Sequence, residues 1–276
     1  MVARARAQTD RGIAAALAAL AIAACGARAQ EGEVRAPFIT TPPEVVARML
    51  QLAGTGLQDT VIDLGSGDGR IVIAAARDHG ARGLGIELDP KLVALARENA
   101  RRAGVADRAR FEEGDALKAE LTQASVVTIY LLPFLLEQLQ PRLLGQLRPG
   151  ARVVTHAFAM KGWPPDRAET VRLSARHEGQ GDESRIFLWV VPAQVRGAWA
   201  APGGWRLRIH QNFQQIEVEA AQDGRPVEVS TARLEGTALS FAGPEISFRG
   251  RAEGSRLTGE LQHRSERTAL GFERAP

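Results

Sequence analysis

Residues 61–70 read Val-Ile-Asp-Leu-Gly-Ser-Gly-Asp-Gly-Arg, an apolar run that ends in an acid and a GxGxG turn. A helix-like stretch at 70–79 follows directly. A buried strand that ends in glycines and opens a helix is typical of a nucleotide-cofactor site, because glycine lets the backbone turn tightly and lets a ligand approach. The spacing differs from the GxGxxG of the dinucleotide fingerprint, and this disfavours a dinucleotide oxidoreductase.

Three later stretches support a cofactor site at the end of this strand. The apolar run 83–86 leads to Glu87, which lies 24 residues after Asp63. This is close to the spacing of about 20 for a carboxylate that binds ribose hydroxyls. An acidic turn at 112–115 and a buried strand from Val126 that runs into a loop at Tyr130 complete the pattern.

The order of the predicted elements indicates an α/β fold. Strands and helices are expected to alternate at 59–64, 70–79, 83–87, 90–103, 109–112, 133–148 and 151–157, with further strands at 168–174 and 184–191. Such alternation predicts a parallel sheet covered by helices on both faces, with the ligand at the carboxyl ends of the strands. Pro141 is expected to divide the 133–148 stretch into two helical pieces. Ahead of the first strand, Thr41 and Glu44 form a predicted capping box with Pro42 at the first helical position.

From residue 195 the pattern changes to short alternating segments separated by turn residues such as Asp223-Gly224. This predicts a small antiparallel β-domain at 195–276, a sandwich or partly closed barrel of about six to eight strands. We expect Trp199 and Trp205 in its core and the lone histidines His210 and His263 at its surface.

The charge of the chain gives little support for a nucleic-acid partner. Its formal charge is +3, but residues 1–29 hold four arginines and one aspartate, and the rest has 31 basic and 31 acidic residues. The single cysteine, Cys25, excludes an intrachain disulfide and a cysteine-based zinc site, and the five histidines contain no HxxxH pair. No metal site is therefore predicted.

The first 29 residues resemble a secretory signal peptide. Three arginines precede an apolar run at 13–24, which is shorter than the roughly 20 residues that a membrane-spanning helix needs. Residues 27–29, Ala-Arg-Ala, match a cleavage pattern, and 22–25, Ile-Ala-Ala-Cys, resemble a bacterial lipobox that would place a lipid on Cys25. We expect export, either periplasmic or lipid-anchored, with membrane contact only if Cys25 is lipidated. A non-functional leader would leave the protein cytoplasmic.

Two stretches carry a family resemblance: Asp-Leu-Gly-Ser-Gly-Asp-Gly-Arg-Ile-Val at 63–72 and Thr-Pro-Pro-Glu-Val-Val at 41–46. They resemble the class I, seven-strand S-adenosylmethionine (AdoMet) methyltransferases, in particular the family that includes the lysine methyltransferase of the ATP-synthase c-subunit. More distantly, the chain is similar to DOT-type histone lysine methyltransferases. The resemblance covers about 37–192 and implies a doubly wound, Rossmann-like seven-stranded sheet within a methyltransferase domain at 30–193.

The resemblance also implies roles for individual residues. The methionine end of AdoMet would be held by Asp63, Gly65, Ser66, Gly67 and Asp68. Glu87 would bind the ribose and Asp115 the adenine, and Thr41 or its neighbour Thr40 would close over the cofactor. The substrate loop would fall at 130–133, which lacks the NPPY or DPPY motif of base methyltransferases and so disfavours DNA adenine as the acceptor.

Methyl transfer requires a positioned, unprotonated acceptor. Tyr130 is the first candidate for lining the acceptor channel or accepting a hydrogen bond, and His156 is the second. The predicted function is AdoMet-dependent N-methylation of protein lysine, with a small-molecule acceptor as the rival. The alternative from another class is an exported ligand-binding or scaffold protein with little catalysis.

Overall fold

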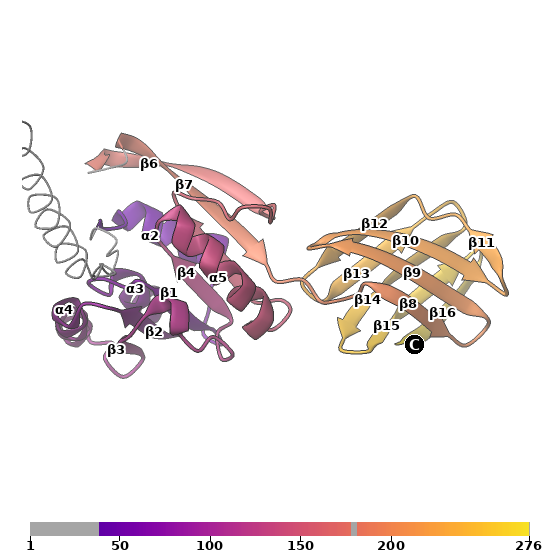
Figure 1. Ribbon diagram of the computed structural model, residues 1–276, viewed down its shortest axis with the longest axis horizontal. Helices are drawn as coiled ribbons and strands as arrows, with labels where there is room; N and C mark the ends of the chain where they lie inside the picture. The colour runs from indigo at the N-terminus through magenta and orange to yellow at the C-terminus, as the bar shows by residue number, and fades with distance from the viewer. Residues whose placement is uncertain (1–38, 178–180, 276) are drawn as a thin grey trace, which may run out of the picture. The chain divides into compact units, whose positions relative to one another are not determined.

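The structure is a computed structural model that describes residues 39–177 and 181–275. The chain forms two sheets in this part, seven-stranded sheet A and nine-stranded sheet B (Figure 1). The strands of sheet A are β1 (Thr60–Leu64), β2 (Arg82–Glu87), β3 (Ala109–Glu113), β4 (Val126–Ile129), β5 (Arg152–His156), β6 (Arg167–His177) and β7 (Gly181–Val190). Its helices are α2 (Pro43–Leu52), α3 (Arg70–His79), α4 (Pro90–Arg102), α5 (Pro133–Gln146) and the 3₁₀ turn η1 (Ala116–Lys118).

Sheet A has the order β3-β2-β1-β4-β5-β7-β6. The strands from β3 to β5 are parallel, and β7 is antiparallel to both of its neighbours. Because β1 lies between β2 and β4, the strand order reverses at β1, and open α/β sheets bind ligands outside the carboxyl ends of the strands at such a point. The predicted seven-stranded, Rossmann-like sheet is confirmed.

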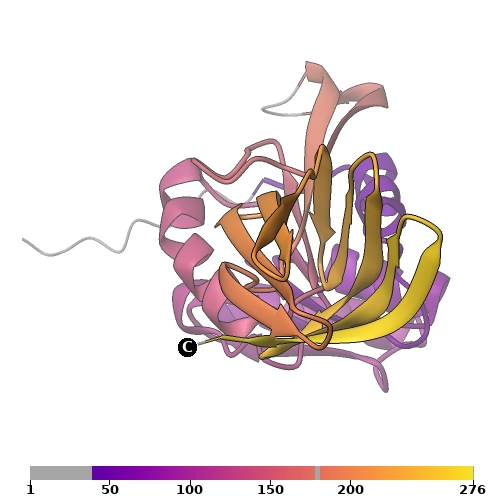
Figure 2. The same cartoon turned by 90° about the vertical axis from the view of Figure 1, so that its right-hand side faces the viewer.

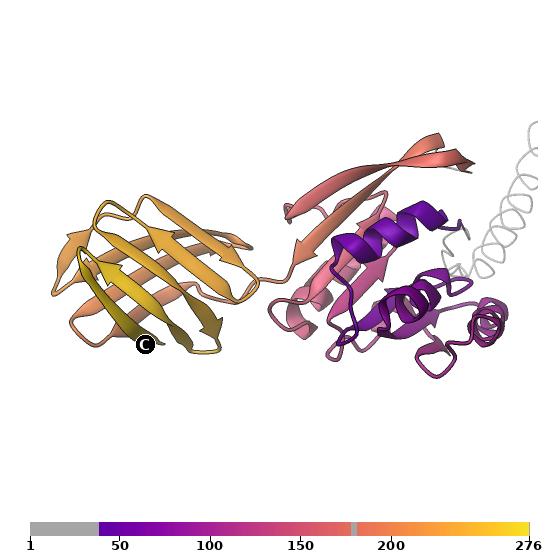
Figure 3. The same ribbon diagram turned by 180° about the vertical axis from the view of Figure 1, so that it is seen from behind.

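Helices cover both faces of sheet A. Val126 and Val154 pack with the buried face of α2, which crosses the sheet on the side seen in Figure 3. Val127 and Val153 point the other way and pack with Leu136 and other residues of α5 (Figure 1). Successive side chains of a strand point to opposite faces, so the continuous apolar runs of β4 and β5 pack into the hydrophobic cores on both sides of the sheet.

The prediction that Pro141 divides the 133–148 stretch is wrong, because α5 is one helix with Pro141 inside it. A proline has no N–H, so the carbonyl of Glu137 loses its helical partner. Both residues are exposed, and water can solvate the freed carbonyl.

The predicted capping box is also wrong. Helix α2 begins at Pro43, and its N-cap, Pro42, makes no side-chain hydrogen bond. The Thr41 hydroxyl lies 3.1 Å from Nδ1 of His156, and the Glu44 carboxylate accepts a hydrogen bond of 3.1 Å from the backbone N–H of Ser174. The side chains of Thr41 and Glu44 thus bond to residues distant in the sequence instead of capping the helix.

Sheet B is one curled antiparallel sheet with the order β11-β10-β9-β8-β16-β15-β14-β13-β12 (Figure 2). Its strands are β8 (Gly197–Ala201), β9 (Trp205–Asn212), β10 (Gln215–Gln222), β11 (Arg225–Val227), β12 (Thr231–Glu235), β13 (Ala238–Ala242), β14 (Ile246–Glu253), β15 (Arg256–His263) and β16 (Glu266–Arg274). The curl brings β12 into contact with β10. The predicted antiparallel β-structure is confirmed. Its nine strands exceed the predicted six to eight, because strands as short as β11 carry too little alternation to be counted from sequence.

The inner face of sheet B is apolar. Trp199 and Trp205 are buried in its core, as predicted, beside Phe248 and Phe272. His210 is exposed on β9, and the ring of partly buried His263 meets Trp205 edge-on at 5.1 Å.

The predicted signal peptide and lipobox lie outside the described residues. The predicted boundary at 193–195 falls in the segment between β7 and β8. In the described part of the chain, none of the helices is both long and apolar enough to cross a membrane.

Candidate functional site

The glycine turn after β1 forms the centre of the candidate site. Gly65, Gly67 and Gly69 have φ values of +77°, +54° and +84°, a region in which other residues are strained. The N–H groups of Gly65 and Ser66 both donate to the carbonyl of Ile86, at 2.9 and 3.0 Å. The turn is therefore fastened to the end of β2, and α3 starts immediately after Gly69.

Two glycines mark close approaches around this turn. A Cβ at Gly65 would lie 2.8 Å from the Cδ2 atom of Leu131, so the loop after β4 packs directly on the turn after β1. A Cβ at Gly85 would lie 2.5 Å from the Ser66 Oγ atom, which is buried and has no hydrogen-bond partner in the described part of the chain. The hydroxyl of Ser66 thus faces β2, and its predicted contact with the cofactor stays a prediction.

Carboxylates surround the turn. Asp63 is 2% exposed and accepts a hydrogen bond of 2.7 Å from the Thr128 hydroxyl. Burial, together with the negative charges of Glu87 and Asp68, raises the pKa of Asp63 to about 7, although the bond from Thr128 acts in the opposite direction. A buried carboxyl group held this way is stabilised in its charged form by a cation placed beside it.

Glu87 connects the end of β2 to the glycine turn. Its Oε2 atom accepts a bond of 2.8 Å from the N–H of Gly67, and its Oε1 atom accepts one of 3.0 Å from the N–H of Asp89. A carboxylate has about four lone-pair sites, so Glu87 can still accept bonds from two hydroxyl groups of a ribose.

These residues fit AdoMet, which carries a sulfonium, an ammonium and one carboxylate. The negative charge at Asp63 and Glu87 suits its net positive charge, whereas the charge of Asp68 is paired with Arg70, and the turn supplies close backbone approach. In the residues that the structure describes, no three His, Cys, Asp or Glu side chains are grouped so that they could hold a metal ion.

Asp115 follows β3, and the N–H of the preceding Gly114 donates to the backbone carbonyl of Glu87 at 2.9 Å. The Oδ1 atom of Asp115 accepts a bond of 2.9 Å from the N–H of Leu117 and so caps η1, and its Oδ2 atom lies 3.5 Å from Nζ of Lys118. The position after β3 matches the predicted adenine site, but the contact itself stays a prediction.

Arg70, for which no role is predicted from the sequence, joins the glycine turn to the segment before α2. Its Nε and Nη2 atoms bond to the two carboxylate oxygens of Asp68 at 2.9 and 2.6 Å. Its Nη1 atom donates to the backbone carbonyl of Thr41 at 2.8 Å. Asp68 therefore orients Arg70, and Arg70 holds the 39–42 segment against the turn.

Tyr130 and His156, the two predicted catalytic residues, lie together. Their ring centroids are 4.1 Å apart, with the planes tilted by 39°. Tyr130 is partly exposed, whereas His156 is fully buried and hydrogen-bonded through both nitrogens, to Thr41 and Ser184. Tyr130 is thus the one of the pair with surface open to an acceptor.

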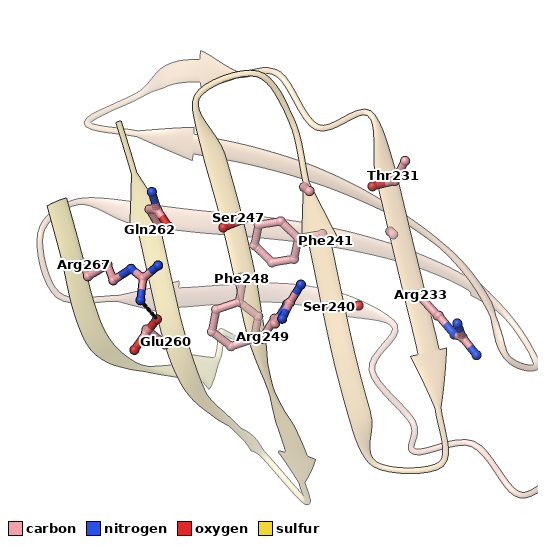
Figure 4. A pocket seen from close by; sticks show the side chains of 12 residues that line it. Thr231, Arg233, Ser240, Phe241, Ser247, Phe248, Arg249, Glu260, Gln262 and Arg267 are labelled. Carbon is pink, nitrogen blue, oxygen red and sulfur yellow. Dashed lines mark ion pairs between the residues drawn. The ribbon is translucent and has the colours of Figure 1, made fainter. Parts of the chain in front are cut away.

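Sheet B has a separate groove of about 570 Å³, lined by residues of β12 to β16 that include polar side chains and the core residues Phe241 and Phe248 (Figure 4). Arg233 pairs with Glu235 at 2.9 Å, and Arg267 pairs with Glu260 at 3.5 Å. These are exposed ion pairs, which contribute about 0–1 kcal/mol each. The groove contains no counterpart of the buried carboxylate of sheet A, so we assign the chemistry to sheet A.

Comparisons with known proteins agree with this assignment. Residues 63–167 match the model of the ANTKMT methyltransferase domain. A protein-lysine N-methyltransferase of Saccharolobus islandicus is 41% identical over 156 residues, which are 56% of this chain and 93% of that protein. The ATP-synthase c-subunit lysine N-methyltransferase of Xenopus laevis is 40% identical over 130 residues, 47% of this chain and 55% of that protein, so the match spans about half of this relative.

A solved structure extends the comparison to a bound cofactor product. An RNA methyltransferase from Salinibacter ruber, in complex with S-adenosylhomocysteine (AdoHcy), is 51% identical with a TM-score of 0.51. The alignment covers 57% of this chain and 96% of that one. The domain match at residues 63–167 runs from within β1 to the first residue of β6, and sheet B lies beyond it.

Proposed function

Because the chain belongs to the family of AdoMet-dependent protein-lysine N-methyltransferases, we propose that it methylates a lysine side chain of a protein acceptor at the carboxyl edge of sheet A. The observation that carries the proposal is the buried Asp63 beside the glycine turn, together with the packing of the Tyr130 loop on that turn. A cofactor site and an acceptor site then adjoin each other.

The cofactor side is built from the turn and its carboxylates. AdoMet supplies a methyl group on a positively charged sulfur, which an acceptor nitrogen can displace directly. We assign the methionine end to Asp63 and to the turn from Gly65 to Asp68, the ribose to Glu87 and the adenine to Asp115. Arg70 holds the Thr41 segment beside this site and so limits access of water.

The acceptor side must favour a neutral amine. A lysine has an ordinary pKa near 10.4, and an apolar environment lowers it by disfavouring the charged form. Leu131, Leu132 and Pro133 follow Tyr130 and provide apolar surface, and the Tyr130 hydroxyl is a group that can accept a hydrogen bond from the amine. Much of the rate acceleration then comes from holding the amine in line with the methyl group.

RNA is the second acceptor class to test, since the Salinibacter ruber protein carries that name and is 51% identical. The charge balance disfavours it, because residues 30–276 contain 31 basic and 31 acidic residues. Binding to a phosphate backbone depends on an excess of positive charge.

We also propose, on the basis of the sequence alone, that the N-terminal leader directs export. Two mature forms are possible: a periplasmic protein cleaved after Ala29, or a lipid-anchored protein cleaved before Cys25. If Cys25 carries a lipid, the Cys25→Ala variant is expected to move the mature protein from the membrane to the soluble fraction after cell fractionation, whereas a periplasmic form is soluble in the parent as well. An unprocessed protein recovered in the cytosol would contradict export.

The test of the function is transfer of a tritiated methyl group from AdoMet to a cell extract by the full chain, with the Asp63→Ala variant as a control. After acid hydrolysis, the label is expected in methylated lysine, and protease but not ribonuclease should release it from the precipitable fraction. Label in a methylated nucleoside would replace the protein acceptor by RNA. The absence of label above the Asp63→Ala control would refute the proposal.

A further inference from the structure

A chain of hydrogen bonds links three distant segments behind Tyr130. The Thr41 hydroxyl, in the segment before α2, lies 3.1 Å from Nδ1 of His156 at the end of β5. Nε2 of His156 lies 3.1 Å from the Ser184 hydroxyl on β7. All three residues are buried, with 4%, 0% and 4% of their surfaces exposed.

This arrangement fixes the orientation of the His156 ring. A neutral imidazole donates from one nitrogen and accepts at the other, and a hydroxyl can do either, so both bonds form in either tautomer. A ring held at both nitrogens cannot rotate about its side-chain bonds without breaking a buried hydrogen bond, which is costly.

The fixed ring in turn contacts Tyr130. The centroid separation of 4.1 Å and the tilt of 39° place the imidazole against the phenol ring. Tyr130 belongs to the loop whose next residue, Leu131, packs on Gly65 of the cofactor turn. The position of Tyr130 relative to the cofactor therefore depends on His156 from one side and on the turn from the other.

Thr41 connects the same chain to the cofactor side. The backbone carbonyl of Thr41 accepts a hydrogen bond from Arg70, which is held by Asp68 in the glycine turn. The Thr41 hydroxyl is hydrogen-bonded to His156. One residue thus links the cofactor turn to the histidine behind the acceptor loop.

We propose that His156 is a positioning residue that, held between Thr41 and Ser184, sets the orientation of Tyr130 relative to the bound cofactor. The effect of His156 on methyl transfer rests on the proposed function, whereas its effect on the orientation of the Tyr130 ring does not. Since a displacement of about 1 Å can reduce a rate by about 100-fold, loss of either hydroxyl is expected to lower kcat by about 10-fold to 100-fold and to change the KM for the acceptor much less.

Tyr130 is the only tyrosine of the chain, and it therefore provides a probe that needs no acceptor. In the full chain labelled with tyrosine that carries ¹³C at the ring ε carbons, all ring signals come from Tyr130. Thr41→Val and Ser184→Ala each remove one hydroxyl, and Thr41→Ser restores it. Ser174→Ala is the matched control, because Ser174 lies on β6 and bonds to Glu44 of α2 without contacting the His156 chain.

The proposal predicts that Thr41→Val and Ser184→Ala each shift the Tyr130 signals, in the absence and presence of AdoHcy. Their combined effect should differ from the sum, because both act through His156. Thr41→Ser and Ser174→Ala should retain the parent spectrum. The proposal is overturned if both hydroxyl deletions leave the signals of a folded protein unchanged, or if Ser174→Ala shifts them equally.

The kinetic arm uses the acceptor found with labelled AdoMet. A fall in kcat in Thr41→Val and Ser184→Ala, with KM retained and with recovery in Thr41→Ser, supports the positioning role. An unchanged kcat overturns it. If the protein methylates nothing, the proposed function fails, whereas the Tyr130 spectra still decide whether His156 orients that ring.

Discussion

Replacement of Asp63 by asparagine is expected to stabilise the cofactor-free protein at pH 8, although it weakens cofactor binding. Asp63 is buried, and its pKa is raised to about 7 by burial first and then by the charges of Glu87 and Asp68. An amide has nearly the same shape, can still accept the bond from Thr128 and carries no charge at any pH of interest.

The magnitude follows from the two pKa values of Asp63. Between its ordinary pKa of 3.8 and the folded value of about 7, the native state keeps a proton that the unfolded chain has released. The free energy of unfolding therefore falls as the pH rises through this window. At 1.36 kcal/mol per pKa unit, the loss by pH 8 is about 4 kcal/mol, and relaxation around the charge reduces the expected gain from Asp63→Asn to about 1–3 kcal/mol.

The assay is urea unfolding of the cofactor-free full chain at pH 6 and pH 8. The matched control is Asp59→Asn, at the other end of β1. Burial raises the pKa of Asp59, but hydrogen bonds from Ser125 and Gly56 and the nearby Arg152 outweigh it and hold the pKa below its usual value. Asp59→Asn is therefore expected to destabilise at both pH values by about 1–3 kcal/mol. If Asp63→Asn destabilises at pH 8 as Asp59→Asn does, the argument about Asp63 is refuted.

Three further predictions concern the cofactor and the two sheets. If AdoMet binds the ionised form of Asp63, the affinity of the protein for AdoMet should rise about 10-fold from pH 6 to pH 8. With a pKa of about 7, about one-tenth of the Asp63 carboxyl group is ionised at pH 6 and about nine-tenths at pH 8. Calorimetry should find this pH dependence in the parent and not in Asp63→Asn. Gly69→Ala is expected to lower the midpoint of urea unfolding, because φ at Gly69 is +84° and the new Cβ would lie 2.6 Å from Cζ of Phe111. An unchanged midpoint would contradict this contact. Phe248→Ala should cost about 3–5 kcal/mol of stability in sheet B, whereas its exposed neighbour Arg249→Ala should unfold like the parent; equal midpoints would disprove the assigned core.

The parts of the fold predicted from sequence are those whose signal is local. The strand before Gly65, the turn and the helix at 70–79 were all predicted, because an apolar run, glycines at fixed spacing and helical periodicity act on neighbouring residues. The carboxylates Asp63 and Glu87 were predicted from their positions at the ends of β1 and β2. Parallel strands bring their carboxyl ends to one edge of a sheet, so the two carboxylates were expected near each other.

The connections behind the site depend on residues far apart in the chain. Thr41 and His156 are 115 positions apart, and nothing local distinguishes a threonine that caps a helix from one that bonds a distant histidine. Arg70 stood within the predicted motif, but its role depends on the path of the segment at Thr41. Only the three-dimensional arrangement reveals that Ser184 has a part in the site.

The central proposal for this molecule is that AdoMet binds beside Tyr130 at the carboxyl edge of sheet A. Calorimetric titration of AdoMet into the full chain, with Glu87→Gln alongside, tests this most directly. Saturable one-to-one binding by the parent, weakened about 10-fold or more in Glu87→Gln, is the predicted result. Equal affinity in the two proteins, or no binding by the folded parent, would contradict the account.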